Sequence, residues 1–274
     1  MELTLHNGDC LEIMKSIPDK SVDLIICDLP YGCLTNQTGV SMGFIRENQN
    51  EEVKKKLAKQ SGEGCAWDIK IDLTKFWEQV KRIRKSDHTP TIHFCTTKFG
   101  YDLIKSNPDE FRYDLVWDKQ RGVSFLSANK MPMRSHEMIY VFSKAGAFYQ
   151  RKDIEGDFKK WFHKKDGVIK SKTYKSGYDI KQTTPDGGDG KRCVLSVIPN
   201  AGSLKKGNHP TEKPEALYRF LIDRYCPVGG MVLDPTFGSG NSVFTAFAMG
   251  RSAIGIEKDE TFFKKAEEKL NALP

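Results

Sequence analysis

Apolar runs and helix-like apolar spacing alternate along most of this chain. Near-continuous apolar runs bounded by turn residues, such as 22–27 (VDLIIC) and 91–95, predict strands that are buried on both faces of a parallel sheet. Apolar residues at helical spacing, as at 73–83, predict helices between those strands. The predicted strands are 3–5, 22–27, 91–95, 113–117, 138–142, 231–233 and 253–256, and the predicted helices are 10–16, 73–83, 99–105, 214–225, 241–249 and 260–270. This alternation predicts an α/β fold whose sheet is mostly parallel.

Two stretches depart from the alternation. Residues 33–66 contain few apolar anchors, which fits either a solvated surface excursion or a mobile loop. Residues 150–208 are rich in Lys and Gly and contain the turn cluster PDGGDG at 185–190. We therefore expect an inserted subdomain at 150–208, between two halves of one α/β domain at 1–149 and 209–274.

The net charge of the chain is concentrated in that insertion. The 274 residues include 43 Lys or Arg and 36 Asp or Glu, which gives a net charge of +7. Residues 151–206 alone contain 14 basic and 7 acidic residues, so this segment carries the whole excess. Basic residues gathered in one segment indicate binding to nucleic-acid phosphates, although a solvated basic face has the same composition.

Cysteine usage and hydropathy exclude several other classes of protein. The seven cysteines form no CxxC pair, which argues against a zinc site and against a disulfide framework. No apolar run approaches the length of a membrane span, and the first residues do not resemble a secretory signal. We expect a cytoplasmic protein that holds no metal ion.

A glycine-rich loop, Asp234-Pro-Thr-Phe237-Gly238-Ser-Gly240, lies between a predicted strand and a predicted helix. Glycines allow a ligand to approach the backbone, and the helix N-terminus offers free N–H groups. Glu257 ends the next predicted strand, where nucleotide-binding α/β units place an acid that binds ribose hydroxyls. Because the chain contains neither a complete GxGxxG nor a P-loop, a nucleoside ligand without phosphates is favoured over a pyrophosphate.

A second motif, Asp28-Leu29-Pro30-Tyr31, directly follows the apolar run at 22–27. Open α/β sheets bind ligands at the carboxyl ends of their strands, where this acid and this ring are expected to lie. Taken alone, the motif is equally consistent with a plain turn at the end of a strand.

The order of these motifs resembles that of the β-group of S-adenosylmethionine-dependent DNA amino-methyltransferases. The chain carries DLPY at 28–31, the basic segment at 151–206, HPTEKP at 209–214 and DPTFGSG at 234–240, in that order. Residues 7–25, 116–125 and 134–142 match the same group. The resemblance implies a Rossmann-like methyltransferase fold with helices on both faces of a twisted sheet. It also implies a circularly permuted motif order and an inserted target-recognition subdomain.

The resemblance assigns the catalytic roles to 28–31. Asp28 and the carbonyl of Leu29 would accept hydrogen bonds from the target amine, so that its lone pair points at the methyl donor. Pro30 would stiffen the loop, and Tyr31 would stack on a base flipped out of the duplex. Leu29 departs from the family pattern, which has proline there, but leucine also supplies a backbone carbonyl.

The resemblance also implies a binding site for the cofactor S-adenosylmethionine. The residues that would form it are Asp9, Lys213, Asp234, Phe237, Gly238, Gly240 and Glu257. Asp234 and the glycine loop would hold the methionine part, Glu257 would bind the ribose hydroxyls and Asp9 would contact the adenine. Lys213 would lie near the cofactor without a defined role, and no metal ion is required.

The function expected from the resemblance is methylation of the N6 amine of adenine in double-stranded DNA. An Asp at the head of the catalytic motif is typical of adenine enzymes in this group, whereas Ser is commoner in cytosine-N4 enzymes. Methylation of cytosine N4 and a catalytically silent DNA-binding relative are the alternatives. A cognate restriction endonuclease and a second copy of the chain are further partners that the family allows, and the sequence distinguishes neither.

Overall fold

The computed structural model describes nine segments of the chain. They are residues 1–31, 70–123, 128–155, 168–169, 178–179, 186–188, 191–192, 194–199 and 212–273. The chain divides into two compact units, one formed by Met1–Tyr149 with Val197–Pro274 and the other by Gln150–Ser196. The segment 33–66, expected as a surface excursion or mobile loop, lies outside the described residues, as does most of the basic segment 151–206.

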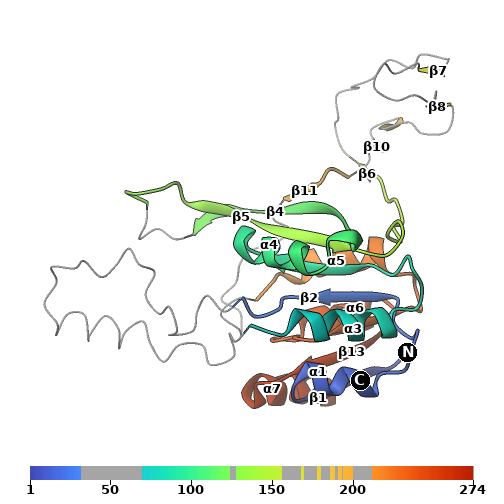
Figure 1. Ribbon diagram of the computed structural model, residues 1–274, viewed down its shortest axis with the longest axis vertical. Helices are drawn as coiled ribbons and strands as arrows, with labels where there is room; N and C mark the ends of the chain where they lie inside the picture. The colour runs from blue at the N-terminus through green and yellow to red at the C-terminus, as the bar shows by residue number, and fades with distance from the viewer. Residues whose placement is uncertain are drawn as a thin grey trace, which may run out of the picture. The chain divides into compact units, whose positions relative to one another are not determined.

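The larger unit is built on an eight-stranded, mostly parallel sheet with the strand order β1-β13-β12-β2-β3-β5-β4-β11 (Figure 1). Its strands are β1 (Leu3–Asn7), β2 (Leu24–Cys27), β3 (Thr91–Cys95), β4 (Phe111–Val123), β5 (Arg134–Phe142), β11 (Val197–Pro199), β12 (Met231–Asp234) and β13 (Ser252–Glu257). β5 runs antiparallel to both of its neighbours, and the other pairs in the sheet are parallel. The amino-terminal strands β1 and β2 therefore pair with the carboxyl-terminal strands β13 and β12. This arrangement fits the permuted motif order.

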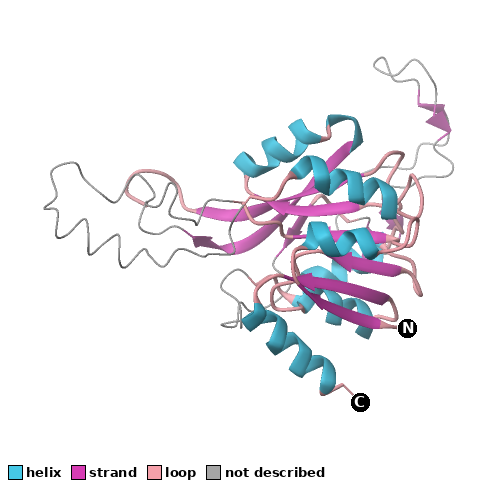
Figure 2. Cartoon of the chain, turned by 60° about the horizontal axis from the view of Figure 1, so that its bottom comes forward, coloured by secondary structure: helices cyan, strands magenta, loops and turns pink. Residues whose placement is uncertain are grey.

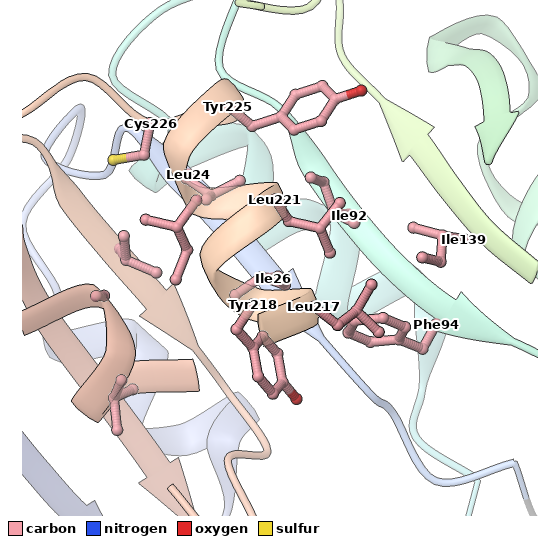
Figure 3. Close-up of a cluster of buried hydrophobic side chains, with 14 of the residues drawn as sticks. Leu24, Ile26, Ile92, Phe94, Ile139, Leu217, Tyr218, Leu221, Tyr225 and Cys226 are labelled. Carbon is pink, nitrogen blue, oxygen red and sulfur yellow. The ribbon is translucent and has the colours of Figure 1, made fainter. Parts of the chain in front are cut away.

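Helices cover both faces of this sheet (Figure 2). The helices are α1 (Cys10–Ile13), α3 (Leu73–Ile83), α4 (Thr97–Ser106), α5 (Glu215–Tyr225), α6 (Asn241–Ala248) and α7 (Glu260–Asn271), with 3-10 turns η1 (Met14–Ser16) and η2 (Pro108–Glu110). One apolar core joins the sheet to α5, α6 and α7, and a second joins its other face to α1, α3 and α4. In the first core, Leu217 and Leu221 of α5 pack with Ile92 (Figure 3). The predicted α/β class with helices on both faces is confirmed.

Local sequence explains where these elements begin and end. β2 and β3 are buried along their whole length, as expected for apolar runs at the middle of a sheet covered on both faces. Asp72 caps α3 by accepting hydrogen bonds from two backbone N–H groups, and Asp259 caps α7 in the same way. The helix predicted at 73–83 and the strand predicted at 91–95 have the observed bounds. The strands predicted at 113–117 and 138–142 are the central parts of longer strands.

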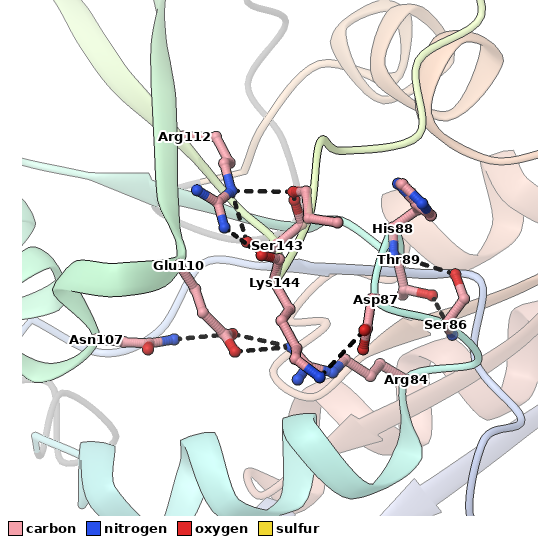
Figure 4. Close-up of polar contacts among 11 residues, drawn as sticks. Arg84, Ser86, Asp87, His88, Thr89, Asn107, Glu110, Arg112, Ser143 and Lys144 are labelled. Atoms are coloured by element: carbon pink, nitrogen blue, oxygen red, sulfur yellow. Dashed lines mark hydrogen bonds and ion pairs between the residues drawn. The ribbon is translucent and has the colours of Figure 1, made fainter.

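Polar contacts fix the base of the β4–β5 pair to the amino-terminal edge of the sheet (Figure 4). Arg84, which follows α3, donates to both carboxylate oxygens of Glu110 at 3.0 Å. Arg112 Nε donates to the Ser143 carbonyl at 2.7 Å, which ties the start of β4 to the end of β5. Since Glu110 and Ser143 are mostly buried, these contacts anchor one end of the two strands firmly.

The smaller unit contains short strands: β6 (Ile154–Glu155), β7 (Val168–Ile169), β8 (Tyr178–Asp179), β9 (Asp186–Gly188) and β10 (Lys191–Arg192). β6, β10 and β9 form one antiparallel sheet, and β7 pairs with β8. This unit ends at Ser196, and Val197–Pro199 pairs with β4 in the large sheet. Within the described segments, no helix is both long and apolar enough to cross a membrane.

Candidate functional site

Four acidic residues stand at the carboxyl ends of four adjacent strands. In sheet order they are Asp9 just beyond β1, Glu257 at the end of β13, Asp234 at the end of β12 and Asp28 just beyond β2. The four strands are mutually parallel, so their carboxyl ends share one edge of the sheet. The two sequence motifs, which lie about two hundred residues apart, are therefore neighbours at this edge.

Direct contacts join the loops that follow β2 and β12. Thr236 Oγ1 donates a hydrogen bond to the backbone carbonyl of Asp28 at 3.2 Å. Asn241, the first residue of α6, donates from Nδ2 to Glu212 Oε1 at 2.7 Å and to the Lys213 carbonyl at 3.0 Å. The motif at 28–31, the glycine loop and the segment before α5 thus form one continuous site.

Asp234 holds the glycine loop in shape. Its buried carboxyl group accepts hydrogen bonds from Thr236 N at 2.9 Å and from the Ser242 hydroxyl. Burial raises the pKa of Asp234 to about 7. Since these partners belong to the loop and to α6, the geometry gives Asp234 a structural part in presenting the loop.

The glycines of the loop are required by its backbone. Gly238 and Gly240 have φ values of 56° and 81°, in the left-handed region that glycine adopts without strain. A Cβ atom at Gly240 would lie 2.7 Å from the ring of Phe244. Phe237 lies in the apolar core, where its ring leaves no room for a side chain at Gly255. The two glycines thus allow the tight turn that leads into α6.

Glu257 is oriented by backbone donors from two loops. Gly238 N donates to its Oε2 at 2.9 Å, and Asp259 N donates to its Oε1 at 2.7 Å. Burial raises the pKa of Glu257 above its ordinary value. Asp9 caps α1 through Leu11 N at 3.0 Å and pairs with Lys258 at 3.1 Å.

This acidic edge fits S-adenosylmethionine by the chemistry of its groups. Carboxylates such as those of Glu257 and Asp9 accept hydrogen bonds from ribose hydroxyls and from amines, and negative charge suits a cationic sulfonium. The glycine loop supplies a surface on which backbone can contact a ligand closely. Among the described residues, no three His, Cys, Asp or Glu side chains are grouped so that they could hold a metal ion.

The Asp28 carboxylate is held from two sides. Tyr31 donates its hydroxyl to Asp28 Oδ1 at 2.5 Å, and the Lys213 ammonium lies 2.5 Å from Asp28 Oδ2. Burial and the neighbouring carboxylates raise the pKa of Tyr31 well above its ordinary value, so the hydroxyl stays a donor. The ring of Tyr31 packs against Phe99 with centroids 5.0 Å apart. A carboxylate with four lone-pair sites still has acceptor capacity when these two donors are bound.

Leu29 and Pro30 complete the turn after β2. The Leu29 side chain is only 1% exposed and belongs to the apolar core beneath α1 and α3. The side chain packs in the core, and the backbone carbonyl expected to act in the site is common to every residue type.

Lys213 lies beside the Asp28 carboxylate. It is 5% exposed, with its ammonium between Asp28 and Glu137, 3.3 Å from Glu137 Oε1, and above the ring of Phe94. Burial alone would lower the pKa of Lys213, but the carboxylates of Asp28 and Glu137 raise it above its ordinary value. The sequence placed Lys213 near the cofactor without a defined role, and the structure brings it to the Asp28 carboxylate.

Glu137 and Lys119 are site residues that the sequence did not indicate. Glu137 on β5 pairs with Lys119 on β4 at 2.8 Å, and both side chains are mostly buried. Burial opposes ionisation of Glu137, but Lys213 and Lys119 lower its pKa below the ordinary value. Lys119 lies at 116–125 and Glu137 at 134–142, two stretches that match the resembled group. That match is the sequence feature from which these residues could have been found. Two acids and two lysines make this buried cluster electrically neutral.

Comparison with known proteins identifies a matching family. The N6/N4 family model, described as DNA methylase, matches residues 22–268. The type II methyltransferase M.HinfI of Haemophilus influenzae is 28% identical over 98% of this chain and 68% of its own length. The type II methyltransferase M.ScaI of Streptomyces caespitosus is 24% identical over 99% of this chain and 82% of its own length.

Solved structures share the fold. The M1.HpyAVI–SAM complex superposes with a TM-score of 0.56 at 17% identity, covering 97% of this chain and 99% of the other. PvuII DNA methyltransferase, which is cytosine-N4-specific, has a TM-score of 0.63 at 14% identity, covering 100% of this chain and 89% of its own.

Proposed function

Because the chain belongs to the N6/N4 DNA methylase family, we propose that it methylates the exocyclic N6 amine of an adenine flipped out of duplex DNA. Membership makes it an S-adenosylmethionine-dependent DNA methyltransferase, and the identity of the target amine is the proposed part. The observation that carries the proposal is the Asp28 carboxylate, which is held by Tyr31 and Lys213, while Thr236 of the glycine loop donates to the backbone carbonyl of Asp28.

The cofactor site is proposed at the acidic edge of the sheet. Glu257 would bind ribose hydroxyls, Asp9 would contact the adenine ring, and the backbone of Gly238 and Gly240 would approach the methionine part. Asp234 would support this loop from beneath. When bound, S-adenosylmethionine supplies a methyl group already activated by its sulfonium.

The residues of this chain would orient the acceptor amine. The lone pair of an exocyclic amine is delocalised into its ring, so the amine is a poor nucleophile. Hydrogen bonds from the amine to Asp28 and to the Leu29 carbonyl would localise the lone pair and aim it at the methyl group. Two donors on Asp28 leave its carboxylate little freedom to turn away from the substrate.

Tyr31 is proposed to have two roles: it holds the Asp28 carboxylate and it positions the target base. Its ring rests on Phe99, and its hydroxyl is engaged by Asp28, so the ring plane is fixed before substrate arrives. A fixed aromatic face next to the acceptor groups suits stacking with an extruded base. The basic segment 151–206, which lies mostly outside the described residues, is proposed to bind DNA phosphates.

The head of the catalytic motif favours adenine. Asp28 offers a charged acceptor, as in the adenine enzymes that the motif resembles, whereas a serine head is commoner for cytosine N4. The structural likeness to a cytosine-N4-specific enzyme keeps cytosine N4 as the second candidate.

One experiment tests the proposal directly. The chain is incubated with methyl-labelled S-adenosylmethionine and duplex DNA of mixed sequence, and the DNA is digested to nucleosides. Label in N6-methyl-2′-deoxyadenosine supports the proposal, and label in N4-methyl-2′-deoxycytidine replaces adenine with cytosine. Asp28→Asn, assayed in parallel, shows whether the observed transfer depends on this site.

A further inference from the structure

The β4–β5 pair extends past the rest of the sheet at the edge that carries the site (Figures 1 and 2). Residues 138–142 of β5 pair with β3 on one side and with β4 on the other. His136 and Arg134 pair with β4 alone. We call the described residues 119–123 and 128–136 the ribbon: 119–123 and 134–136 are the ends of β4 and β5, and 128–133 are turn and irregular residues that lead into β5.

The direction of the strands places the ribbon beside the catalytic motif. β3 and β4 are both antiparallel to β5, so the carboxyl end of β4 lies at the same edge as the carboxyl ends of β2 and β3. Lys119, the first residue of the ribbon, forms an ion pair with Glu137, and Glu137 also contacts Lys213 of the site. A ligand bound at Asp28 would therefore extend toward the ribbon.

A β-bulge redirects the ribbon where it leaves the sheet. The pairing register of β4 shifts between Asp118 and Val123. Gln120 has a φ of 52° in this interval, and its N–H is bound by the Asp118 carboxylate at 2.9 Å. Bulges bend a strand and increase its twist, and they are common next to active sites.

The composition of the ribbon fits a polyanionic partner. Between Asp118 and Glu137 the chain has four Lys or Arg and no Asp or Glu. The exposed members are Arg121, Lys130 and Arg134. Met131 and Met133, on the same extension, are 56% and 49% exposed. Basic and apolar side chains that face solvent add little to the stability of this extension, because an isolated pair of strands is only marginally stable.

We propose that the ribbon is a second DNA-binding element, which contacts the duplex next to the flipped base; this rests on the proposed function. Arg121 and Arg134 bind phosphates, and Met131 and Met133 make apolar contact with the groove. A two-stranded β-ribbon fits the width of the major groove, and base-modifying chemistry requires the duplex close to Asp28. The contact is distinct from the basic segment 151–206, since the ribbon belongs to the α/β unit.

Salt dependence of duplex binding tests the arginine contacts. The full chain and the variant R121S/R134S are titrated with a fluorescent duplex over a range of salt concentrations. Each lost phosphate contact reduces the slope of log affinity against log salt by about 0.9, so the variant should lose about two from the slope. The matched control is K81S/K105S, which removes two exposed charges from the last turns of α3 and α4, at the opposite edge of the sheet. A slope equal to that of the control overturns the proposal.

The methionine contact predicts a different signature. M131S/M133S should weaken duplex binding about tenfold at every salt concentration without changing the slope, because apolar contact releases no counterions. If the methionines instead join two copies of the chain, sedimentation will show loss of a dimer with DNA affinity unchanged, and the proposal fails. If the wild-type chain binds no duplex, the proposed function is overturned as well. If the wild type binds and methylates DNA while the ribbon variants behave like the control, only the proposal that the ribbon binds DNA is overturned.

Discussion

The Lys213 ammonium lies 2.5 Å from Asp28 Oδ2 and also contacts Glu137, which pairs with Lys119 on the neighbouring strand. The Asp28 carboxylate is therefore one member of a mostly buried, neutral set of four charges. A buried charge is stabilised only when its partners remain in place, so each member affects how the others are held. The site residues given by the sequence motif act within a larger electrostatic unit that also includes β4 and β5.

Replacing Asp28 should separate catalysis from cofactor binding. Asp28→Asn keeps the shape of the side chain but removes the charge that accepts from Tyr31 and Lys213. We expect kcat to fall by about 10²–10³, the range seen when one preorganised polar contact at a reacting group is lost. Calorimetric titration with S-adenosylmethionine should give an unchanged Kd, because Glu257 and the glycine loop are untouched. A collapse of cofactor affinity would contradict this division of roles.

Replacing Glu137 should change the pH dependence of the reaction. Glu137→Gln removes one of the two carboxylates that raise the pKa of Lys213, so that pKa should fall. The alkaline limb of the kcat profile should therefore move to lower pH. The profile is measured under saturating cofactor and DNA.

Glu110→Gln is the matched control for Glu137. Glu110 is also a mostly buried carboxylate in an ion pair, with Arg84, but it lies at the opposite edge of the sheet. Both variants should lose stability, and only Glu137→Gln should shift the profile. Equal profiles for the two variants would show that Glu137 has a purely structural part.

The elements of the fold were predictable where the cause is local. The apolar period and the Asp72 cap define α3, and the uninterrupted apolar run defines β3, with no information from distant residues. The outer parts of β4 and β5 are exposed and carry mixed polar and apolar residues, so no pattern marked them as strands. Pairing across the ribbon, a non-local interaction, supplies their order.

The site was predictable only in part for a related reason. Asp28, Asp234 and Glu257 follow apolar runs, and parallel strands bring their ends together at one edge. The pairing of Lys213 with Glu137 depends on how α5 and β5 lie across β3, which no sequence spacing reveals. The same limit applies to Tyr31, whose hydroxyl engages Asp28 in a way that the expected stacking role did not include.

Leu29 should matter for stability more than for chemistry. Its side chain is buried in the core, so Leu29→Ala should lower the free energy of unfolding by about 2–5 kcal/mol, measured by urea denaturation. Leu29→Met nearly conserves volume and should cost less than about 1.5 kcal/mol. Activity per folded molecule should be retained in both, because each supplies the same backbone carbonyl. A large loss of kcat in the stable Met variant would place the side chain in the chemistry.

An added methyl group should be more harmful at Gly240, which is closely packed, than at Gly229, which is not. Gly240→Ala forces a side chain to φ 81° and within 2.7 Å of the Phe244 ring, at the start of α6. Gly229→Ala meets the same kind of backbone at φ 77° but has open space around it. Both variants should lose about 1–2 kcal/mol of stability, because alanine is strained in the left-handed region. Only Gly240→Ala should weaken S-adenosylmethionine binding, by tenfold or more, and tenfold corresponds to about 1.4 kcal/mol of binding free energy. Equal cofactor affinity in the two variants would contradict the proposed place of the loop.

His93 should make the protein sensitive to mild acid. It is completely buried beside Cys27 and among the rings of Phe76, Trp77 and Phe142, and burial lowers its pKa to about 3. An unfolded chain binds a proton at His93 below about pH 6.5, but the native state does so only near pH 3. Stability contributed by the neutral ring is thus complete above pH 6.5 and is lost as pH falls, by up to about 1.4 kcal/mol per pH unit.

The test of the His93 prediction is the slope of stability against pH. Urea unfolding of the wild type between about pH 5 and pH 6.5 should show the slope, and His93→Gln, which cannot titrate, should lose about one proton's worth of it. His88→Gln serves as the control, because His88 is exposed and contacts the Gly146 carbonyl at the surface. An unchanged slope in His93→Gln would mean that the native protein accommodates a charged imidazolium beneath the catalytic motif. Because His93 touches Cys27, directly before Asp28, such a charge would also alter the site. If the ring stays neutral in the folded protein, the rate of methyl transfer should fall with pH only as far as the protein unfolds. If the folded protein takes up the proton, the rate should fall at a higher pH than unfolding.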